Sequence, residues 1–432
     1  MVNALSQLRA KLPFNYAWMI LSILFLGLLA SFGVRASFGA YIRPWEQDFS
    51  VDRTVVTSIS MLSFIVFALA QPLAGKLHDR LGGRIVPSVG ILLVGGCLLL
   101  SSKATHIWQL YIYFGVGFSL GIAGCSNVIA TAIITRWFAA KRGFALGLVV
   151  SGMAVGQLIM VPATLSLINQ FNWRIAMTVI SLSILVLVVP AMFFFVRSNP
   201  EDEGLQPYGE VAYPDEKDLI KHNKQTPLEQ KTSIFPVIKL KAFWQLTIPY
   251  FICGFTDVGL IQTHLIPLAQ GKGFPTTIVA ISFSMIAIFN ILGTISTGYM
   301  SDHFHRSRQL GLIYAIRAVT FVFLLTIKIP WLLIPFAIIY GSTEMASIAP
   351  TNSLTIHLFD GYSIGTILGF VSVSHQIGGA LGSWIPGLLF DLTGSYGFVI
   401  LLSVALLMGS AALVLHVPEP RYSLTQVSQE NI

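Results

Sequence analysis

The stretch GKLHDRLGGR at residues 75–84 follows an apolar segment, and it returns in reduced form as GYMSDH at residues 298–303. The first Gly and the Asp of the two stretches are both separated by 223 residues. A second similarity pairs three positions of an earlier apolar segment with three of a later one. In order, Gly147, Gly156 and Pro162 correspond to Gly369, Gly378 and Pro386. A parallel repeat of this length predicts two similar halves.

The composition of the chain is that of a membrane protein. Of its 432 residues, 54% are hydrophobic and only 10% are charged, and the mean hydropathy is +0.75. A soluble domain carries about 25% charged residues. The few charges cannot cover the surface of a globule, so most of the surface must face lipid. This composition excludes a soluble enzyme.

Charges, Gly and Pro divide the chain into twelve apolar stretches, each long enough to cross a bilayer. We therefore expect an all-α membrane protein with twelve transmembrane helices in two pseudo-symmetric six-helix bundles. The expected bundles cover 1–197 and 242–417, joined by a polar linker at 198–241 and followed by a tail at 418–432. The expected spans are 15–42, 54–75, 85–103, 107–135, 143–167, 173–197, 242–270, 276–300, 310–327, 331–357, 363–390 and 396–417.

The distribution of basic residues predicts the orientation. With the N-terminus inside, eighteen of the 26 Lys and Arg residues fall in inner segments and six in outer ones. The positive-inside rule then places both termini and the linker in the cytoplasm. Topology accounts for the net charge of +7, so no nucleic-acid partner is expected.

Residues 75–84 resemble the signature that follows the second helix in the major facilitator superfamily. The pattern Gly-x-Leu-x-Asp-Arg-x-Gly-x-Arg is matched throughout, by Gly75, Leu77, Asp79, Arg80, Gly82 and Arg84. The resemblance implies that Asp79, Arg80 and Arg84 belong to a gate at the cytoplasmic mouth, with Asp302 in the second copy. Gly allows close helix approach there, and Asp can bond a neighbouring helix end or pair with Arg.

Within that superfamily, the stretch WFAAKRGFALGLVVSG at residues 137–152 is similar to the fifth-helix signature of the monocarboxylate porter group. Arg35 lies where that family carries a cation in its first helix. Two departures concern the cargo: NYAW at 15–18 keeps only the aromatic end of the family's first motif, and 276–300 contains no Lys or Arg. The resemblance implies a small organic anion as substrate, a monomeric transport unit and a bacterial inner membrane. Bacterial relatives also include oxalate and formate exchangers and carriers of carboxylate siderophores.

Ionisable side chains inside spans are functional candidates, because each costs at least about 2.5–3.5 kcal/mol to insert. Arg35 is the candidate anion contact, since a guanidinium binds a carboxylate with two hydrogen bonds. A structural ion pair or an interfacial anchor is the alternative. The repeat offset of 223 residues places Asp257 at nearly the same depth in the membrane as Arg35. It is expected either to pair with Arg35 across the empty cavity and couple protons to transport, or to form a static ion pair.

The remaining candidates are polar groups on other spans. Glu344 is the second candidate for proton coupling, and Arg317 is expected to lock Glu344 or a backbone carbonyl. His264 is expected to contact substrate or carry the proton, or else to be a hydrogen-bonded interface histidine. His375 lies among glycines, so a cavity role competes with helix packing. Asn127 is the best neutral candidate for substrate contact.

Motifs for other chemistry are missing from the sequence. It contains no phosphate-binding loop, so ATP is not expected to drive transport, and no metal, nucleophile or cofactor motif is present. We therefore predict a non-enzymatic, proton-linked secondary carrier of small organic anions, without cofactor or metal. Two alternatives remain open: a carrier of a larger polycarboxylate, and a substrate-sensing receptor that signals through the linker at 198–241.

Overall fold

The computed structural model describes residues 15–209, 235–359 and 362–417. In these ranges twelve helices are long and apolar enough to cross a membrane, and their bounds agree closely with the predicted spans. The predicted fold class, with two six-helix bundles, is confirmed. Residues 210–234 of the predicted linker and the predicted tail at 418–432 lie outside the described residues.

The N-terminal bundle holds six spans, of which the fourth and the sixth are composite. In chain order its elements are α2 (Tyr16–Ala36), α4 (Arg53–Leu81), α5 (Ile85–Ser102), α6 (Ile107–Leu110), η1 (Tyr111–Phe118), α7 (Ser119–Gly124), α8 (Asn127–Trp137), α9 (Arg142–Gln170), α10 (Trp173–Ser183), η2 (Ile184–Val188) and α11 (Val189–Phe195). Helix α3 (Phe38–Phe49) follows α2 directly, so the first span ends earlier than the sequence predicted.

The C-terminal bundle also holds six spans, of which the seventh and the tenth are composite. Its elements are α14 (Lys241–Gly254), η4 (Phe255–Ile261), α15 (Gln262–Gly271), α16 (Thr276–His303), α17 (Arg306–Thr326), η5 (Pro330–Leu332), α18 (Leu333–Glu344), α19 (Ile348–Leu358), α20 (Ile364–Thr393) and α21 (Gly397–Leu415). Between the bundles lie η3 (Pro200–Glu203) and α13 (Phe235–Ile238). The break between α18 and α19 matters for the site, because Glu344 ends α18 there.

Helices inside each bundle approach closely where small residues meet backbone, as is common in membranes. A Cβ on Gly33 of α2 would lie 2.7 Å from the carbonyl oxygen of Gly156 on α9. In the C-terminal bundle, Gly378 and Gly382 of α20 lie against the backbone of Phe251 and Phe255. One buried apolar core belongs to the N-terminal bundle, and the other combines the C-terminal bundle with Ala36, Ala40, Val161 and Leu165 of the N-terminal bundle.

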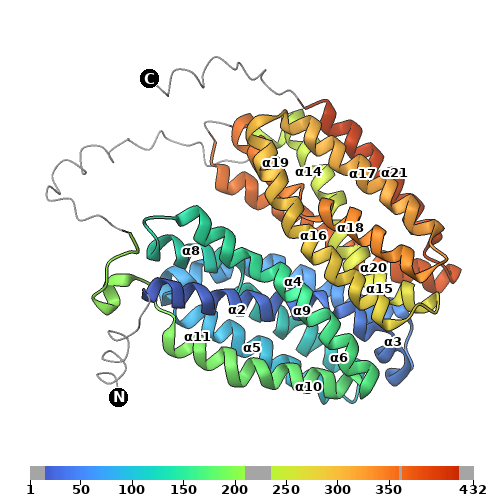
Figure 1. The fold of residues 1–432 in the computed structure, drawn as a ribbon, viewed down its shortest axis with the longest axis horizontal. Helices are drawn as coiled ribbons and strands as arrows, with labels where there is room; N and C mark the ends of the chain where they lie inside the picture. Colours follow the sequence, from blue (N-terminus) through green and yellow to red (C-terminus); the bar gives the residue numbers. More distant parts are fainter. Residues whose placement is uncertain (1–14, 210–234, 360–361, 418–432) are drawn as a thin grey trace.

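The two bundles meet at one end and diverge at the other. Figure 1 shows them separating towards the side of the linker, and converging where α3 lies near α15. At the converging end a Cβ on Gly387 would clash with Thr57 of the other bundle. At the diverging end a Cβ on Gly75 or Gly298 would meet no atom within 4 Å. We call these two ends the closed end and the linker end.

Candidate functional site

A cavity of about 310 Å³ lies between the bundles, and both contribute to its wall. Its polar lining consists of one arginine, one histidine, a tyrosine, a serine and six amides: Arg35, His375, Tyr250, Ser372, Gln71, Asn127, Gln157, Gln262, Asn352 and Gln376. No carboxylate of the described residues lines it. The electrostatic character of the cavity is therefore set by a single cation among neutral hydrogen-bonding groups.

Arg35 lies at the end of α2, one residue before the helix stops at Ala36. Its guanidinium carbon lies 4.2 Å from the ring centroid of Phe64 and 4.5 Å from that of Phe67. Contact with the faces of two aromatic rings stabilises a cation that has left water. The Nη2 atom is buried and has no hydrogen-bond partner. Arg35 is therefore a fixed cation with an unused donor.

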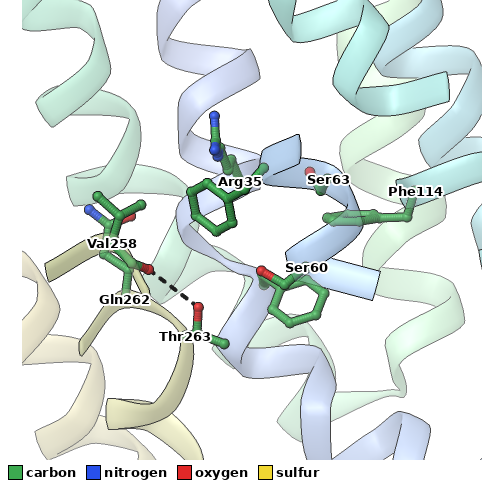
Figure 2. Close-up of a pocket in the computed structure, with 9 residues that line it drawn as sticks. Arg35, Ser60, Ser63, Phe114, Val258, Gln262 and Thr263 are labelled. Carbon is green, nitrogen blue, oxygen red and sulfur yellow. Dashed lines mark hydrogen bonds between the residues drawn. The ribbon is translucent and has the colours of Figure 1, made fainter. Parts of the chain in front are cut away.

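A small recess extends the site towards the closed end. Figure 2 shows Arg35 from one bundle and Val258 and Gln262 from the other around this recess. Ser60 and Ser63 of α4 add hydroxyl groups. Arg35, Val258 and Gln262 line both the recess and the larger cavity, so the two spaces share one wall.

Two other predicted contacts also reach the cavity. Asn127 begins α8 and lies in the lining, as does His375 of α20, whose ring packs 4.6 Å from that of Tyr250. Sequence reasoning did not single out Gln71, Gln262, Asn352 or Gln376. The sequence signal for these four residues was an amide side chain within an apolar span. That signal does not distinguish a cavity contact from a hydrogen bond between helices.

Asp257 does not pair with Arg35. It is 3% exposed and its Oδ2 lies 3.8 Å from Nη1 of Arg317 on α17, while the hydroxyl of Tyr340 donates to its Oδ1. The predicted pair across the cavity is therefore wrong in this conformation. The repeat explains the error: Asp257 corresponds to Val34, which is buried in its bundle, and the counterpart of Arg35 is Val258, which lines the cavity.

Glu344 is buried beside this ion pair, with a relative exposure of 1%. Its two carboxylate oxygens accept hydrogen bonds from Nε2 of Gln262 at 2.9 Å and Nδ2 of Asn290 at 3.0 Å. Arg317 donates to the backbone carbonyls of Glu344, at 2.8 Å, and of Thr343. The expectation that Arg317 would lock a backbone carbonyl is confirmed.

His264 lies at the closed end and not in the cavity lining. Its Nδ1 is 3.0 Å from the hydroxyl of Tyr396, and its Nε2 is 2.7 Å from the carbonyl oxygen of Ser383. Both ring nitrogens are thus used within the C-terminal bundle, because η4 and α15 turn this face towards α20. The prediction of substrate contact is not supported, and the position matches the hydrogen-bonded alternative.

The predicted gate residues lie at the linker end. The side chains of Asp79 and Arg80 are exposed at the end of α4. Arg84 donates from Nε to the carbonyl oxygen of Phe193 at 2.9 Å, within its own bundle. Asp302 belongs to the last turn of α16, and its side chain lies outside the described part of the chain. The two bundles are apart at this end of the molecule (Figure 1).

Two pseudo-symmetric six-helix bundles around a central polar cavity define a membrane transporter of the twelve-helix type. The sequence model of the Major Facilitator Superfamily matches residues 23–383, and the chain belongs to this superfamily.

Similar proteins cover nearly the whole chain. Monocarboxylate transporter 13 of Rattus norvegicus is 25% identical, over 94% of this chain and 89% of its own. The uncharacterised MFS-type transporter YcxA of Bacillus subtilis is 22% identical, over 93% and 95%. Among solved structures, the D-xylose-proton symporter aligns with a TM-score of 0.71 at 15% identity, covering 94% of this chain and 99% of its own. That structure bears on the fold alone.

Proposed function

We propose that the protein is a proton-linked secondary carrier of small organic anions of the monocarboxylate type, working by alternating access. Arg35 is the main anion contact, with Asn127 and His375 as hydrogen-bonding partners. The name of the rat relative supports this substrate class.

The observation that carries the proposal is the state of Arg35. Its guanidinium is held between Phe64 and Phe67 in a cavity without carboxylates, and its Nη2 has no partner. A buried cation without a counter-ion is costly, and a carboxylate that binds it removes that cost. Charge-assisted bonds between arginine and carboxylate are about twice as strong as neutral ones. Anion binding is therefore the chemistry for which this cation is suited.

Proton coupling is assigned to the buried carboxyl groups of the C-terminal bundle, Glu344 and Asp257. Neither lines the cavity, but Glu344 is connected to it through Gln262. With both termini and the linker in the cytoplasm, as the basic residues predict, the cavity opens to the cytoplasm in this conformation. The transport unit is proposed to be one chain in the cell membrane, with Asp79, Arg80, Arg84 and Asp302 at its cytoplasmic gate.

A larger polycarboxylate is the second candidate cargo. Six amides line the cavity, which is more than an anion of lactate size would use, and a volume of about 310 Å³ lies within the range of drug-sized ligand sites. Against it, Arg35 is the sole arginine or lysine among the described residues of the lining. No feature of the described residues favours the receptor hypothesis.

The proposal is tested by uptake into proteoliposomes with an imposed inward proton gradient. The labelled panel runs from formate and lactate to citrate, and wild type is compared with Arg35→Ala. Arg43→Ala is the matched control, because Arg43 of α3 lies outside the cavity lining. We expect gradient-driven accumulation of a small anion that Arg35→Ala abolishes and Arg43→Ala retains. If correctly folded wild type accumulates no small anion, this proposal fails and the polycarboxylate candidate is tested next.

A further inference from the structure

Gln262 joins the central cavity to the buried carboxyl group of Glu344. It is the first residue of α15, after the wide turns of η4, and it lines the cavity and the recess together with Arg35 (Figure 2). Its Nε2 donates to Oε1 of Glu344 at 2.9 Å. A single side chain therefore contacts the buried acid and also faces the space that holds the anion.

Donor and acceptor counts show what happens when Glu344 changes its charge. An ionised carboxylate only accepts hydrogen bonds, as it does here from Gln262 and Asn290. A protonated carboxyl group carries an O–H that must donate to an acceptor. Asn290 is 1% exposed and does not line the cavity, whereas Gln262 lines it. Rotation of the Gln262 amide therefore offers its oxygen to this O–H and at the same time turns its Nε2 towards the cavity.

We propose that Gln262 is the positioning residue that couples proton binding at Glu344 to anion binding at Arg35. When Glu344 takes up a proton from water, the amide of Gln262 rotates and its oxygen accepts the new O–H. Its Nε2 then faces the cavity as a second donor for the anion beside Arg35. Release of the anion and loss of the proton reverse the rotation. This inference rests on the proposed function, since it requires proton-linked anion transport.

The surrounding charges single out Glu344 as the acid that changes state. Arg317 and Asp257 face it from α17 and η4, and they balance each other as an ion pair. The other titratable groups around this pair are Tyr340 of α18, Cys253 and Tyr250 of α14, Tyr314 of α17 and His375 of α20. Glu344 has amide partners but no cation of its own, so its charged form is the costly one in this interior.

The test compares two transport modes in proteoliposomes: accumulation driven by an inward proton gradient, and exchange of labelled for unlabelled anion without a gradient. The probe is the best substrate of the carboxylate panel. For Gln262→Leu we expect exchange to persist while gradient-driven accumulation is lost. In wild type we expect the KM for the anion to fall about tenfold towards acid pH, because the rotated Gln262 adds one charge-assisted hydrogen bond. In Gln262→Leu we expect the KM not to fall. Gln270→Leu is the matched control: it removes an amide of the same helix that lines neither the cavity nor the recess, and should keep the dependence on the gradient.

Each outcome has a separate meaning. If wild type exchanges anions but does not respond to the proton gradient, the proposed function fails together with this inference. If wild type responds and Gln262→Leu responds equally, only the role of Gln262 is overturned. Gln262→Asn is the second variant, for use if Gln262→Leu does not fold. Its shorter amide cannot reach Glu344 and the cavity in turn, so accumulation must again be lost.

Discussion

Arg53 of the N-terminal bundle and Tyr396 of the C-terminal bundle are joined by a 2.9 Å hydrogen bond between the guanidinium Nη1 and the phenol oxygen. Arg53 is 6% exposed and donates to both carboxylate oxygens of Glu46. Its guanidinium carbon lies 3.9 Å from the ring centroid of Phe390. His264 contacts the same phenol. This cluster contributes contacts between the two bundles at the closed end, and the proposed alternating-access cycle requires these contacts to open.

Replacing Arg53 should therefore shift the equilibrium towards a state that is open at this end, which is the outward-open state in the proposed orientation. Arg53→Gln removes a buried, charge-assisted contact between the bundles, and about 1.5–3 kcal/mol is typical for such a bond. We expect Ser60→Cys, in the recess, to react with an external thiol reagent at least about tenfold faster in the Arg53→Gln background. Arg43→Gln removes the same charge from α3 and serves as the control. Equal labelling rates in both backgrounds would show that the cluster does not hold the closed end.

A second contact at the closed end offers a direct test of alternating access. The backbone N and the Oγ1 of Thr54 donate to Oδ2 of Asp391, at 2.7 and 2.6 Å, across the two bundles. Cross-linking Thr54→Cys to Asp391→Cys with a short bis-methanethiosulfonate, which forms a disulfide with each thiol and releases sulfinate, should stop transport, and reduction should restore it. Each single-cysteine variant should be insensitive to the reagent. Undiminished transport by the cross-linked protein would contradict a cycle that opens this end.

The spans were predictable because hydropathy is a local property, and twelve apolar stretches leave little choice of fold. The cavity contacts were partly predictable: Arg35, Asn127 and His375, three of the candidates named from the sequence, line it. The partner of Asp257 was not predictable, because the repeat gives depth along a helix but a shift of one residue turns a side chain by about 100°. Val258, not Asp257, therefore faces the cavity with Arg35.

The Arg317–Asp257 pair should be important for stability as well as for transport. Asp257→Asn leaves Arg317 buried without its counter-ion, and removing one partner of a buried pair costs about 3–5 kcal/mol. We expect a clear loss of thermal stability in detergent. Asp257→Asn combined with Arg317→Gln should recover part of that loss, because no unpaired charge remains. A double variant as unstable as the sum of the two single variants would show that the two side chains act independently.

Glu344→Gln should separate anion movement from proton movement. Glutamine has nearly the shape of a protonated glutamate and cannot ionise, so Gln262 would remain turned towards the cavity. We expect exchange of labelled anion to persist at all pH values, and accumulation driven by a proton gradient to disappear. Asp257→Asn is the comparison, because Asp257 is the other buried acid proposed for coupling. If Glu344→Gln still accumulates anion against its gradient with an unchanged pH profile, the proton is carried elsewhere. An Asp257→Asn variant that retained exchange but lost accumulation would then identify Asp257 as the carrier.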